Sequence, residues 1–429
     1  MAQISVSWLI SAVFVAVISS ALFLREFRIN SPITAVGMDL GTSFSCSAAH
    51  NETSGKAFIL RDEKGRGTTA SIVAFTQEGK ILTGEDARLY ALEFPSRTVF
   101  DAKRFIGRKM SHIKKDLDLD LYPFQVRHSL RQTSSGLKHY RPEEISAEIL
   151  KRLKGVAETN IGRSISQVVL AVPVEFTEEQ MNATTRAAQL AGLEVLRLIY
   201  EPTAAAMAYG LHAKMNVQGI LVFDFGGGTL DVSLLSVSRR VFNVRATYGD
   251  KRLGGEDFNH YMMNYFLENI RKAWGEETVS EREKDRKFIQ AVRAEVERTK
   301  IALSTVESIT FEVHDGGKSY REELNRTHFD HLNRHLFERA MIPVEKVLQC
   351  AEATIDEVDE IVLIGGSSRL LRVRELLREK FGDKLNTEVN PDQAVAMGTA
   401  VQAGILTDAR NIPVAAVEQP YRAPECSNE

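Results

Sequence analysis

The sequence predicts an α/β fold of two similar lobes, each with a central mixed sheet and flanking helices, and a cleft between the lobes. Two observations carry this prediction. From Ile33 onward, strand-like and helix-like segments alternate, which is typical of α/β proteins. In addition, one strand–turn–strand pattern occurs twice, about 185 residues apart, which indicates two related halves rather than a solenoid of short repeats.

The composition is that of an ordinary globular protein. The chain has 429 residues, enough for two sizeable domains, with 44% hydrophobic and 26% charged residues. The net charge of −3 comes from 54 basic and 57 acidic residues. No basic excess indicates binding to nucleic acid, and no acidic tail indicates disorder.

The N-terminus differs from this average. Residues 1–24 contain no charged side chain, and Trp8 to Leu24 is an almost unbroken apolar run. As a helix this run would span roughly 25 Å, slightly less than the hydrocarbon core of a bilayer. We expect residues 1–24 to be a signal peptide or a signal anchor, with residues 8–24 as the means of any membrane association. Arg25 and Arg28 oppose translocation, so cleavage and topology stay open.

The cysteines give no sign of a metal site. Only Cys46, Cys350 and Cys426 occur, far apart and without metal-type spacing. A chain of this size can bury a core without disulfides. We therefore expect packed or free thiols.

The repeated pattern places an acidic residue and glycines at each turn. Residues 34–38 form an apolar strand that ends in Asp39 and leads into the turn Gly41-Thr42-Ser43. Residues 219–223 do the same, with Asp224 before the turn Gly226-Gly227-Gly228-Thr229. Glycine lets backbone N–H groups approach phosphate oxygens, and carboxylates suit hydrated magnesium. A tight hairpin explains one copy equally well, but two copies in matched register favour a clamp on a magnesium-bound triphosphate.

Other segments are assigned in chain order. Thr177 and Gln180 form a capping box that opens a helix ending near Gly192. The stretch from about residue 281 to 304 is charged and amphipathic. A strand over residues 360–364 leads through Gly365-Gly366-Ser367-Ser368 into a helix over residues 369–380. That turn suits a nucleoside or phosphate, or is an ordinary strand–helix turn.

The two glycine turns are not Walker-type loops, because each joins a strand to a strand. Gly317-Lys318-Ser319 imitates the end of a Walker motif, but Glu312 stands where its first glycine belongs, so we reject it. Residues 408–429 contain scattered prolines and no periodicity, which predicts a flexible tail.

Taken together, these motifs resemble the heat shock protein 70 family from about residue 33 to 407. The matching segments are residues 39–43, 101–107, 201–206, 224–229, 253–258, 365–367 and 390–392. The resemblance implies an actin-like ATPase fold, with lobe I at 33–216, lobe II at 217–386 and a return to lobe I at 387–407. It covers only the family's nucleotide-binding domain, and we expect no peptide-binding domain. A targeting segment before such a domain is similar to the microsomal members.

The resemblance also implies catalytic roles. Asp39 and Asp224 would arrange Mg²⁺ through its water shell, and Lys103 would approach the γ-phosphate of ATP. Glu201 would hold the attacking water, and we expect Pro202 to keep it in extended backbone. Contacts to phosphate are implied for Thr42 and Thr229, with Asp231 supporting the site from behind. The remaining nucleotide contacts, to ATP or ADP, would come from Gly41, Ser43, Gly226, Gly227, Gly228, Gly254, Gly255, Glu297, Lys300, Ser304, Gly365, Gly366, Ser367, Arg369 and Asp392.

Two positions depart from the family pattern. Ile301 follows Lys300 where the family usually has an arginine, which leaves Arg369 as the one cation to stack on adenine. Phe44 stands where a tyrosine is common. We expect both changes to affect the affinity for nucleotide more than catalysis.

Two functions remain after these observations. The first is a slow ATPase of the endoplasmic reticulum that works with co-chaperones, nucleotide-exchange factors or other proteostasis proteins, and the intact Lys103, Glu201 and Thr229 favour it. The alternative is a nucleotide-dependent binding or regulatory module with little turnover, which Ile301 favours. A sugar kinase or a filament-forming actin relative of the same superfold is remote, because the fold alone does not set function.

Overall fold

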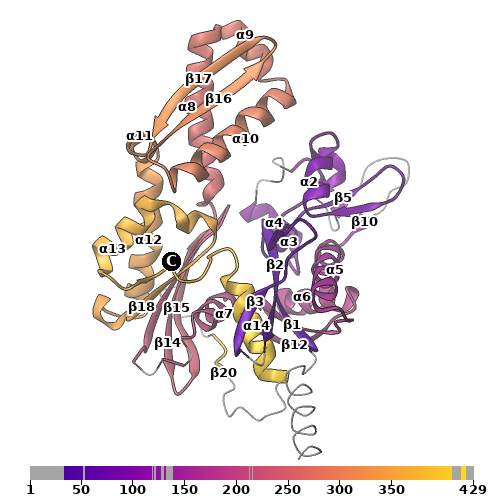
Figure 1. Ribbon diagram of the computed structural model, residues 1–429, viewed down its shortest axis with the longest axis vertical. Helices are drawn as coiled ribbons and strands as arrows, with labels where there is room; N and C mark the ends of the chain where they lie inside the picture. The colour runs from indigo at the N-terminus through magenta and orange to yellow at the C-terminus, as the bar shows by residue number, and fades with distance from the viewer. Residues whose placement is uncertain are drawn as a thin grey trace, which may run out of the picture.

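Two large mixed sheets organise the molecule (Figure 1). The computed structural model describes residues 33–51, 54–117, 119, 122–126, 130–131, 139–211, 213–214, 216–407 and 417–421. The predicted targeting segment, residues 1–24, lies outside them. Within the described ranges, no helix combines the length and apolar character needed to cross a bilayer.

The first sheet has the strand order β12-β11-β1-β2-β3, and β4 pairs with β2. Strand β1 runs parallel to β11 and antiparallel to β2. Helices α5 and α6 pack together, and α5 contacts β2 and shares an apolar cluster with residues of β1 and β11. The bounds are β1 Ala35–Asp39, β2 Phe44–Asn51, β3 Lys56–Ile59, β4 Thr68–Ala70, α5 Pro142–Ile161, β11 Gln167–Val172, α6 Glu178–Leu190 and β12 Glu194–Tyr200.

The second sheet repeats this plan with the order β19-β18-β13-β14-β15-β20. Its central strand β13 runs parallel to β18 and antiparallel to β14, as β1 does with β11 and β2. The bounds are β13 Gly219–Phe225, β14 Leu230–Ser238, β15 Val241–Asp250, β18 Glu360–Ile364, β19 Leu385–Asn386 and β20 Val417–Glu418. The two copies of the sequence pattern are therefore the two central hairpins.

Helices α7 (Glu201–Ala208) and α14 (Ala394–Thr407) join the two sheets. One apolar cluster combines residues of β1, β11 and β12 with residues of β13, β14, β15 and β18, and α7, α14 and connecting residues complete it. The helices cross closely, since a Cβ on Gly398 would lie 1.6 Å from the Ala204 carbonyl oxygen. This contact requires a glycine.

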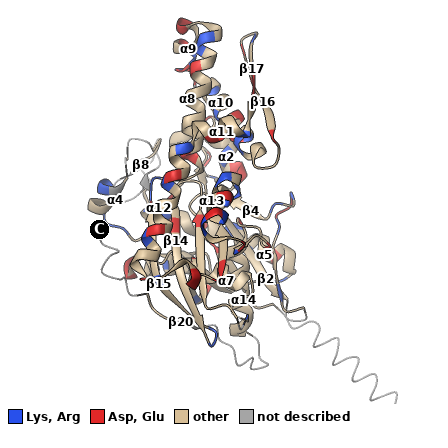
Figure 2. Ribbon diagram, turned by 90° about the vertical axis from the view of Figure 1, so that its left-hand side faces the viewer, with Lys and Arg blue, Asp and Glu red and all other residues tan. Residues whose placement is uncertain are grey.

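Two further groups of elements extend from the sheets (Figure 1). One follows β4 and consists of β5 Val73–Phe75, β6 Ile81–Thr83, α2 Glu85–Ala91, a 3₁₀ turn Pro95–Arg97, β7 Thr98–Val99, α3 Ala102–Phe105, α4 Met110–Asp116, β8 Gln125–Val126, β9 Leu130–Arg131 and β10 His139–Tyr140. The other follows β15 and consists of α8 Gly255–Trp274, α9 Glu276–Arg282, α10 Arg286–Leu303, β16 Ser308–Asp315, β17 Lys318–Asn325, α11 Arg326–Leu332, α12 Arg334–Cys350, two 3₁₀ turns Ile355–Glu357 and Gly366–Arg369, and α13 Leu371–Phe381. In Figure 2, helices such as α9 and α13 carry both acidic and basic residues.

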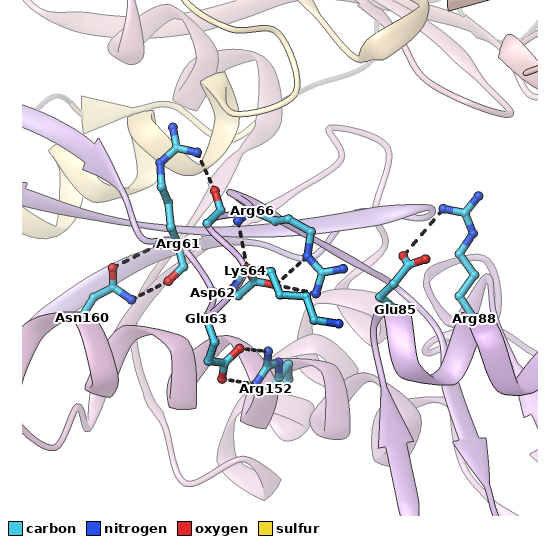
Figure 3. Close-up of polar contacts among 10 residues, drawn as sticks. Arg61, Asp62, Glu63, Lys64, Arg66, Glu85, Arg88, Arg152 and Asn160 are labelled. Carbon is cyan, nitrogen blue, oxygen red and sulfur yellow. Dashed lines mark hydrogen bonds and ion pairs between the residues drawn. The ribbon is translucent and has the colours of Figure 1, made fainter. Parts of the chain in front are cut away.

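A charged loop between β3 and β4 is fastened to α5 (Figure 3). Glu63 accepts two hydrogen bonds from the Arg152 guanidinium, at 2.7 and 3.0 Å. The Asn160 side chain bonds both the N–H and the carbonyl of Arg61. Asp62 pairs with Arg66 within the loop. These ion pairs and hydrogen bonds hold the loop in place.

Most predicted elements are present. The capping box at Thr177 and Gln180 opens α6, and the predicted strand over residues 360–364 is β18. Helix α10 covers most of the amphipathic stretch, and Asp285 caps its start.

Three expectations are wrong. Residues 417–418 form β20 rather than part of a flexible tail, because they pair with the open edge of β15. Glu201 is the first residue of α7 rather than extended, since a proline in the first turn removes no helical hydrogen bond. Cys350 is disulfide-bonded, although Cys46 is free and buried as expected.

Candidate functional site

The two glycine turns face one another across the lobes. Strand β1 ends at Asp39 and β13 carries Asp224 at the matching place, paired with Ile364 on one side and Asp231 on the other. The second turn closes with a hydrogen bond from the Gly226 N–H to the Thr229 carbonyl, 3.0 Å. A Cβ on Gly227 would lie 3.1 Å from the Ser43 hydroxyl oxygen of the first turn. The structure therefore brings together the two motifs that the sequence singles out.

An ion pair joins α3 to α7 at the same place. Lys103 donates to the Glu201 carboxylate, and only 12% and 15% of the two side chains are exposed. Asp101 lies two residues before Lys103 and has left-handed backbone at φ 58°. Its carboxylate accepts a hydrogen bond from the Tyr122 hydroxyl, 3.2 Å. Aspartate tolerates this conformation better than most residues. The bend turns α3 so that its lysine reaches across to α7.

The charges at this point do not balance. Asp39, Asp224 and Glu201 interact with one another, and Lys103 is the cation that they share. Burial raises the pKa of Asp39 to about 7, although Lys103 opposes the shift. Burial and the neighbouring carboxylates raise the pKa of Asp224 well above its ordinary value. For Lys103, burial lowers the pKa, but Glu201 and Asp39 outweigh it and the net shift is upward.

Asp231 lies behind the second turn. Its carboxyl hydrogen-bonds the Thr229 side chain, which lowers its pKa, but burial and Glu175 raise that pKa to about 7 overall. Strand β15 passes so close that a Cβ on Gly249 would lie 2.3 Å from the Asp231 carboxylate oxygen. The Thr229 side chain is therefore hydrogen-bonded to Asp231, whose own side chain is tightly packed against β15.

The start of α8 lies directly against the second turn. The Gly255 N–H donates to the Gly226 carbonyl, 3.1 Å, and the Ser367 hydroxyl donates to the same oxygen, 2.8 Å. A Cβ on Gly254 would lie 2.3 Å from the Gly228 nitrogen. Only glycine permits this close approach of the two backbones.

The residues predicted to surround adenine form two polar groups. In the first, the Lys300 ammonium donates to Glu297, 2.7 Å, and to the Gly255 carbonyl, 2.9 Å. In the second, Arg369 donates to Asp392, 2.6 Å, and a Cβ on Gly366 would lie 3.1 Å from that aspartate. The carbonyl of Pro391 accepts from the Gly365 N–H, 3.1 Å, which ties the two loops together.

The other residues predicted for the site lie in the first turn and at the end of α10. Gly41 and Thr42 are half-buried in the first turn, and Ser304 ends α10 one turn after Lys300. The two departures from the family pattern both lie at the surface, since Ile301 is 59% exposed and Phe44 51%.

One neighbour escaped the sequence analysis. An Arg104 nitrogen lies 2.3 Å from where a Cβ on Gly228 would be, so a cation from α3 touches the second turn. Arg104 also lies 3.4 Å from Asp101. The only sequence signal for Arg104 is its position next to Lys103. Neighbouring residues on a helix point in different directions, so the sequence alone does not show that Arg104 also faces the site.

The donor set fits a hydrated cation better than a bare one. Among the described residues, no group of three or more His, Cys, Asp or Glu side chains is placed to hold a metal directly. Asp39 and Asp224 nevertheless carry the unbalanced negative charge described above. Magnesium retains several waters in such sites, so two carboxylates suffice.

Comparison with protein families gives one finding. The family model described as Hsp70 protein matches residues 35–417. The match therefore contains both glycine turns, the Lys103–Glu201 pair, the adenine-side residues and the first residue of β20.

Proposed function

Because the chain belongs to the Hsp70 family, we propose that it binds ATP with Mg²⁺ between its lobes and hydrolyses it slowly, as a microsomal proteostasis factor. Proteins of this family are ATPases with the actin-like fold, and the two related sheets here have that fold. One observation carries the site: the largely buried Lys103–Glu201 ion pair interacts electrostatically with both Asp39 and Asp224, which lead into the two turns.

Each residue has a distinct task in this proposal. Lys103 places a fixed positive charge where the transferred phosphoryl group develops negative charge, and Glu201 holds that ammonium in place and orients water. Thr229 offers its hydroxyl to a phosphate, with Asp231 behind it. The glycine backbone of the two turns would supply N–H donors. Phosphoryl transfer depends mainly on such positioning and charge stabilisation.

When bound, Mg²⁺ would neutralise phosphate charge and fix the triphosphate relative to the protein. Asp39 and Asp224 would hold it through water, which also offsets their mutual repulsion. Lys300 and Glu297 on one side and Arg369 on the other would receive the nucleoside.

A second candidate is a nucleotide-dependent module with little turnover. Ile301 supports it, because an exposed isoleucine contributes no cation beside the base. The complete set of charged residues near the turns supports hydrolysis more strongly.

Phosphate release by the purified chain tests turnover. Lys103→Ala and Thr229→Ala are expected to lower the rate by about 10²-fold, as removal of a charge or hydrogen-bond donor from a transition state does. Lys272→Ala is the matched control, because Lys272 forms an exposed pair with Glu268 on α8 at 2.8 Å. Equal background rates in all four proteins would overturn hydrolysis while leaving nucleotide binding open.

We also propose the endoplasmic reticulum as its compartment. The apolar run at residues 8–24 supports secretory targeting. The disulfide-bonded Cys350 supports an oxidising compartment, where disulfides persist. Co-chaperones and exchange factors are the proposed partners by analogy with the family. In intact microsomes, the chain should resist added protease until detergent is present, and digestion without detergent would contradict a lumenal site.

A further inference from the structure

Residues 417–421 contact an edge of each sheet. In the second sheet, β20 pairs with β15, and the Gln419 N–H donates to the Phe242 carbonyl, 3.1 Å. In the first sheet, β12 is the outermost strand and Tyr200 is its last residue. The Glu418 carboxylate accepts the Tyr200 N–H with its two oxygens, at 3.1 and 3.2 Å. The side chain of Glu418 therefore joins the second sheet to the first.

Tyr200 is also the residue at which α7 begins. It is the N-cap of that helix and makes no side-chain cap, and Glu201 and Pro202 are the first two helical residues. In a capping box, a Glu or Gln at the third helical position accepts the N–H of the N-cap residue. In α7 the third position is Thr203, and Glu418 accepts that N–H instead, from 218 positions along the chain. The positive end of the helix dipole also favours a carboxylate at this place.

Other contacts strengthen the hold on Tyr200. The Tyr421 N–H donates to the Tyr200 hydroxyl, 3.4 Å, so both the backbone and the side chain of Tyr200 are bonded to the C-terminal segment. Burial raises the pKa of Glu418 to about 7, and the Thr203 side chain and the Tyr200 N–H oppose this shift by stabilising the carboxylate. These contacts fix the backbone immediately before Glu201.

Glu201 connects this backbone to the site between the turns. Its carboxylate accepts from the Lys103 ammonium, and both side chains are largely buried. Because Glu201 follows Tyr200 directly, a shift at the start of α7 moves that carboxylate relative to Lys103. Misplacement of a reacting group by about 1 Å can lower a rate by about 10²-fold.

We infer that Glu418 is a positioning residue: by accepting the Tyr200 N–H, it fixes the start of α7 and thereby the place of the Glu201 carboxylate beside Lys103. The inference rests on the proposed hydrolysis, in which Glu201 holds that ammonium and orients water. Glu418 acts through the backbone of Tyr200, so its loss should change turnover and leave nucleotide affinity unchanged.

Phosphate release by the full chain at saturating Mg-ATP measures kcat. Glu418→Ala should lower kcat by about 3- to 30-fold, the effect of one lost helix cap, while isothermal titration with Mg-ADP should give an unchanged Kd. Glu418→Gln retains an oxygen acceptor on a side chain of the same length and should keep most of the rate. Gln419→Ala is the matched control, because Gln419 is the exposed neighbour in the same segment. Equal kcat values for Glu418→Ala and Gln419→Ala would overturn the inference.

A double-mutant cycle separates positioning from a general loss of stability. In Glu201→Ala the carboxylate to be positioned is gone, so adding Glu418→Ala should lower the residual rate no further. A loss as large as in the unmodified chain would show that Glu418 supports the fold without acting through Glu201, and would overturn the inference.

Hydrogen exchange without nucleotide tests the contact apart from the reaction. In Glu418→Ala the Tyr200 amide should exchange several-fold faster than in the unmodified chain, and in Gln419→Ala its exchange should stay the same. Unchanged exchange in Glu418→Ala would overturn the inference. If the unmodified chain releases no phosphate, the proposed hydrolysis fails, whereas the exchange result still decides whether Glu418 fixes the start of α7.

Discussion

At the level of single residues, the site is defined by charges that need partners. Lys103 and Glu201 neutralise each other, but Asp39 and Asp224 remain close to them with raised pKa values. Such a cluster costs folding free energy unless a cation joins it. In the proposed function, Mg²⁺ bound together with phosphate would supply that cation.

Replacing Ile301 with arginine should tighten nucleotide binding. Ile301 is 59% exposed on α10, one residue after Lys300, so a longer cation fits without repacking. A cation stacked on the base contributes about 0.5–2 kcal/mol, which predicts a lower Kd by roughly 2- to 30-fold. Isothermal titration with Mg-ADP measures it. Ile342→Arg on α12 is the control for an added exposed charge, and an equal effect there would contradict a contact with adenine.

Glu418 makes stability depend on pH. Burial raises its pKa to about 7, opposed by the Tyr200 N–H and by Arg197. A carboxyl whose pKa is raised in the folded state stabilises the fold fully at pH values below its ordinary pKa near 4.5. This stabilisation is lost as the pH rises through 7. The glutamine of Glu418→Gln cannot ionise. Between pH 5 and pH 8, the free energy of unfolding of this variant should therefore rise by about 1–3 kcal/mol relative to that of the unmodified chain.

Denaturant unfolding at several pH values measures this difference. The exposed Glu93, changed to Gln, is the matched control for loss of a surface carboxylate. A stability difference for Glu418→Gln that stays constant from pH 5 to pH 8 would refute the assignment.

The residues differ in how far sequence alone predicts them. Asp39 and Asp224 were found because each stands in a local strand–turn pattern with its glycines. Lys103 and Glu201 pair across 98 positions, and only the family resemblance connected them. No local sequence pattern marks Glu418, because its hydrogen-bond partner Tyr200 is 218 positions away.

At the level of elements, close backbone packing holds the lobes together. Helix α14 lies on β1, β2 and α7, and its backbone approaches so closely that Gly37 in β1 and Gly398 in α14 have no room for a Cβ. These glycines cannot be recognised from sequence, because their need arises from chain segments that meet only in the fold.

Gly398→Ala should therefore destabilise the fold by about 1–3 kcal/mol, as overpacking does. Its Cβ would meet the Ala204 carbonyl at 1.6 Å, so α14 must move away from α7. Gly155→Ala in α5 is the matched control, because nothing lies within 4 Å of its Cβ. That variant should be neutral or more stable by up to about 1 kcal/mol, since alanine favours helix. Equal unfolding midpoints for both variants would contradict the packing explanation.

Elements with local signals were predicted well. The strand at residues 360–364 and the helix after Thr177 follow from an apolar run and a capping box. The pairing of β20 could not be predicted, because two residues show no periodicity and the edge of β15 supplies the partner. The start of α7 was misjudged, because the first turn of a helix accepts proline.

At the level of the whole molecule, nucleotide should act as a bridge between lobes. The two turns come from different sheets, and Ser43 and Gly227 are the residues through which they approach. A ligand that binds both turns stabilises the folded chain by mass action, by about 2.7 kcal/mol at a hundredfold excess over Kd. We expect Mg-ADP at that excess to raise the thermal unfolding midpoint of the full chain.

Chelating magnesium with EDTA should abolish most of this gain. Without the cation, the phosphates of ADP meet the carboxylates of Asp39 and Asp224 directly, and like charges at short range oppose binding. Differential scanning calorimetry with ADP, with Mg²⁺ and with both separates the contributions, and Mg²⁺ alone is the control for a general salt effect. A midpoint that rises equally with ADP and EDTA would show that nucleotide binds elsewhere or without the metal, and the site between the lobes would then lose its chemical basis.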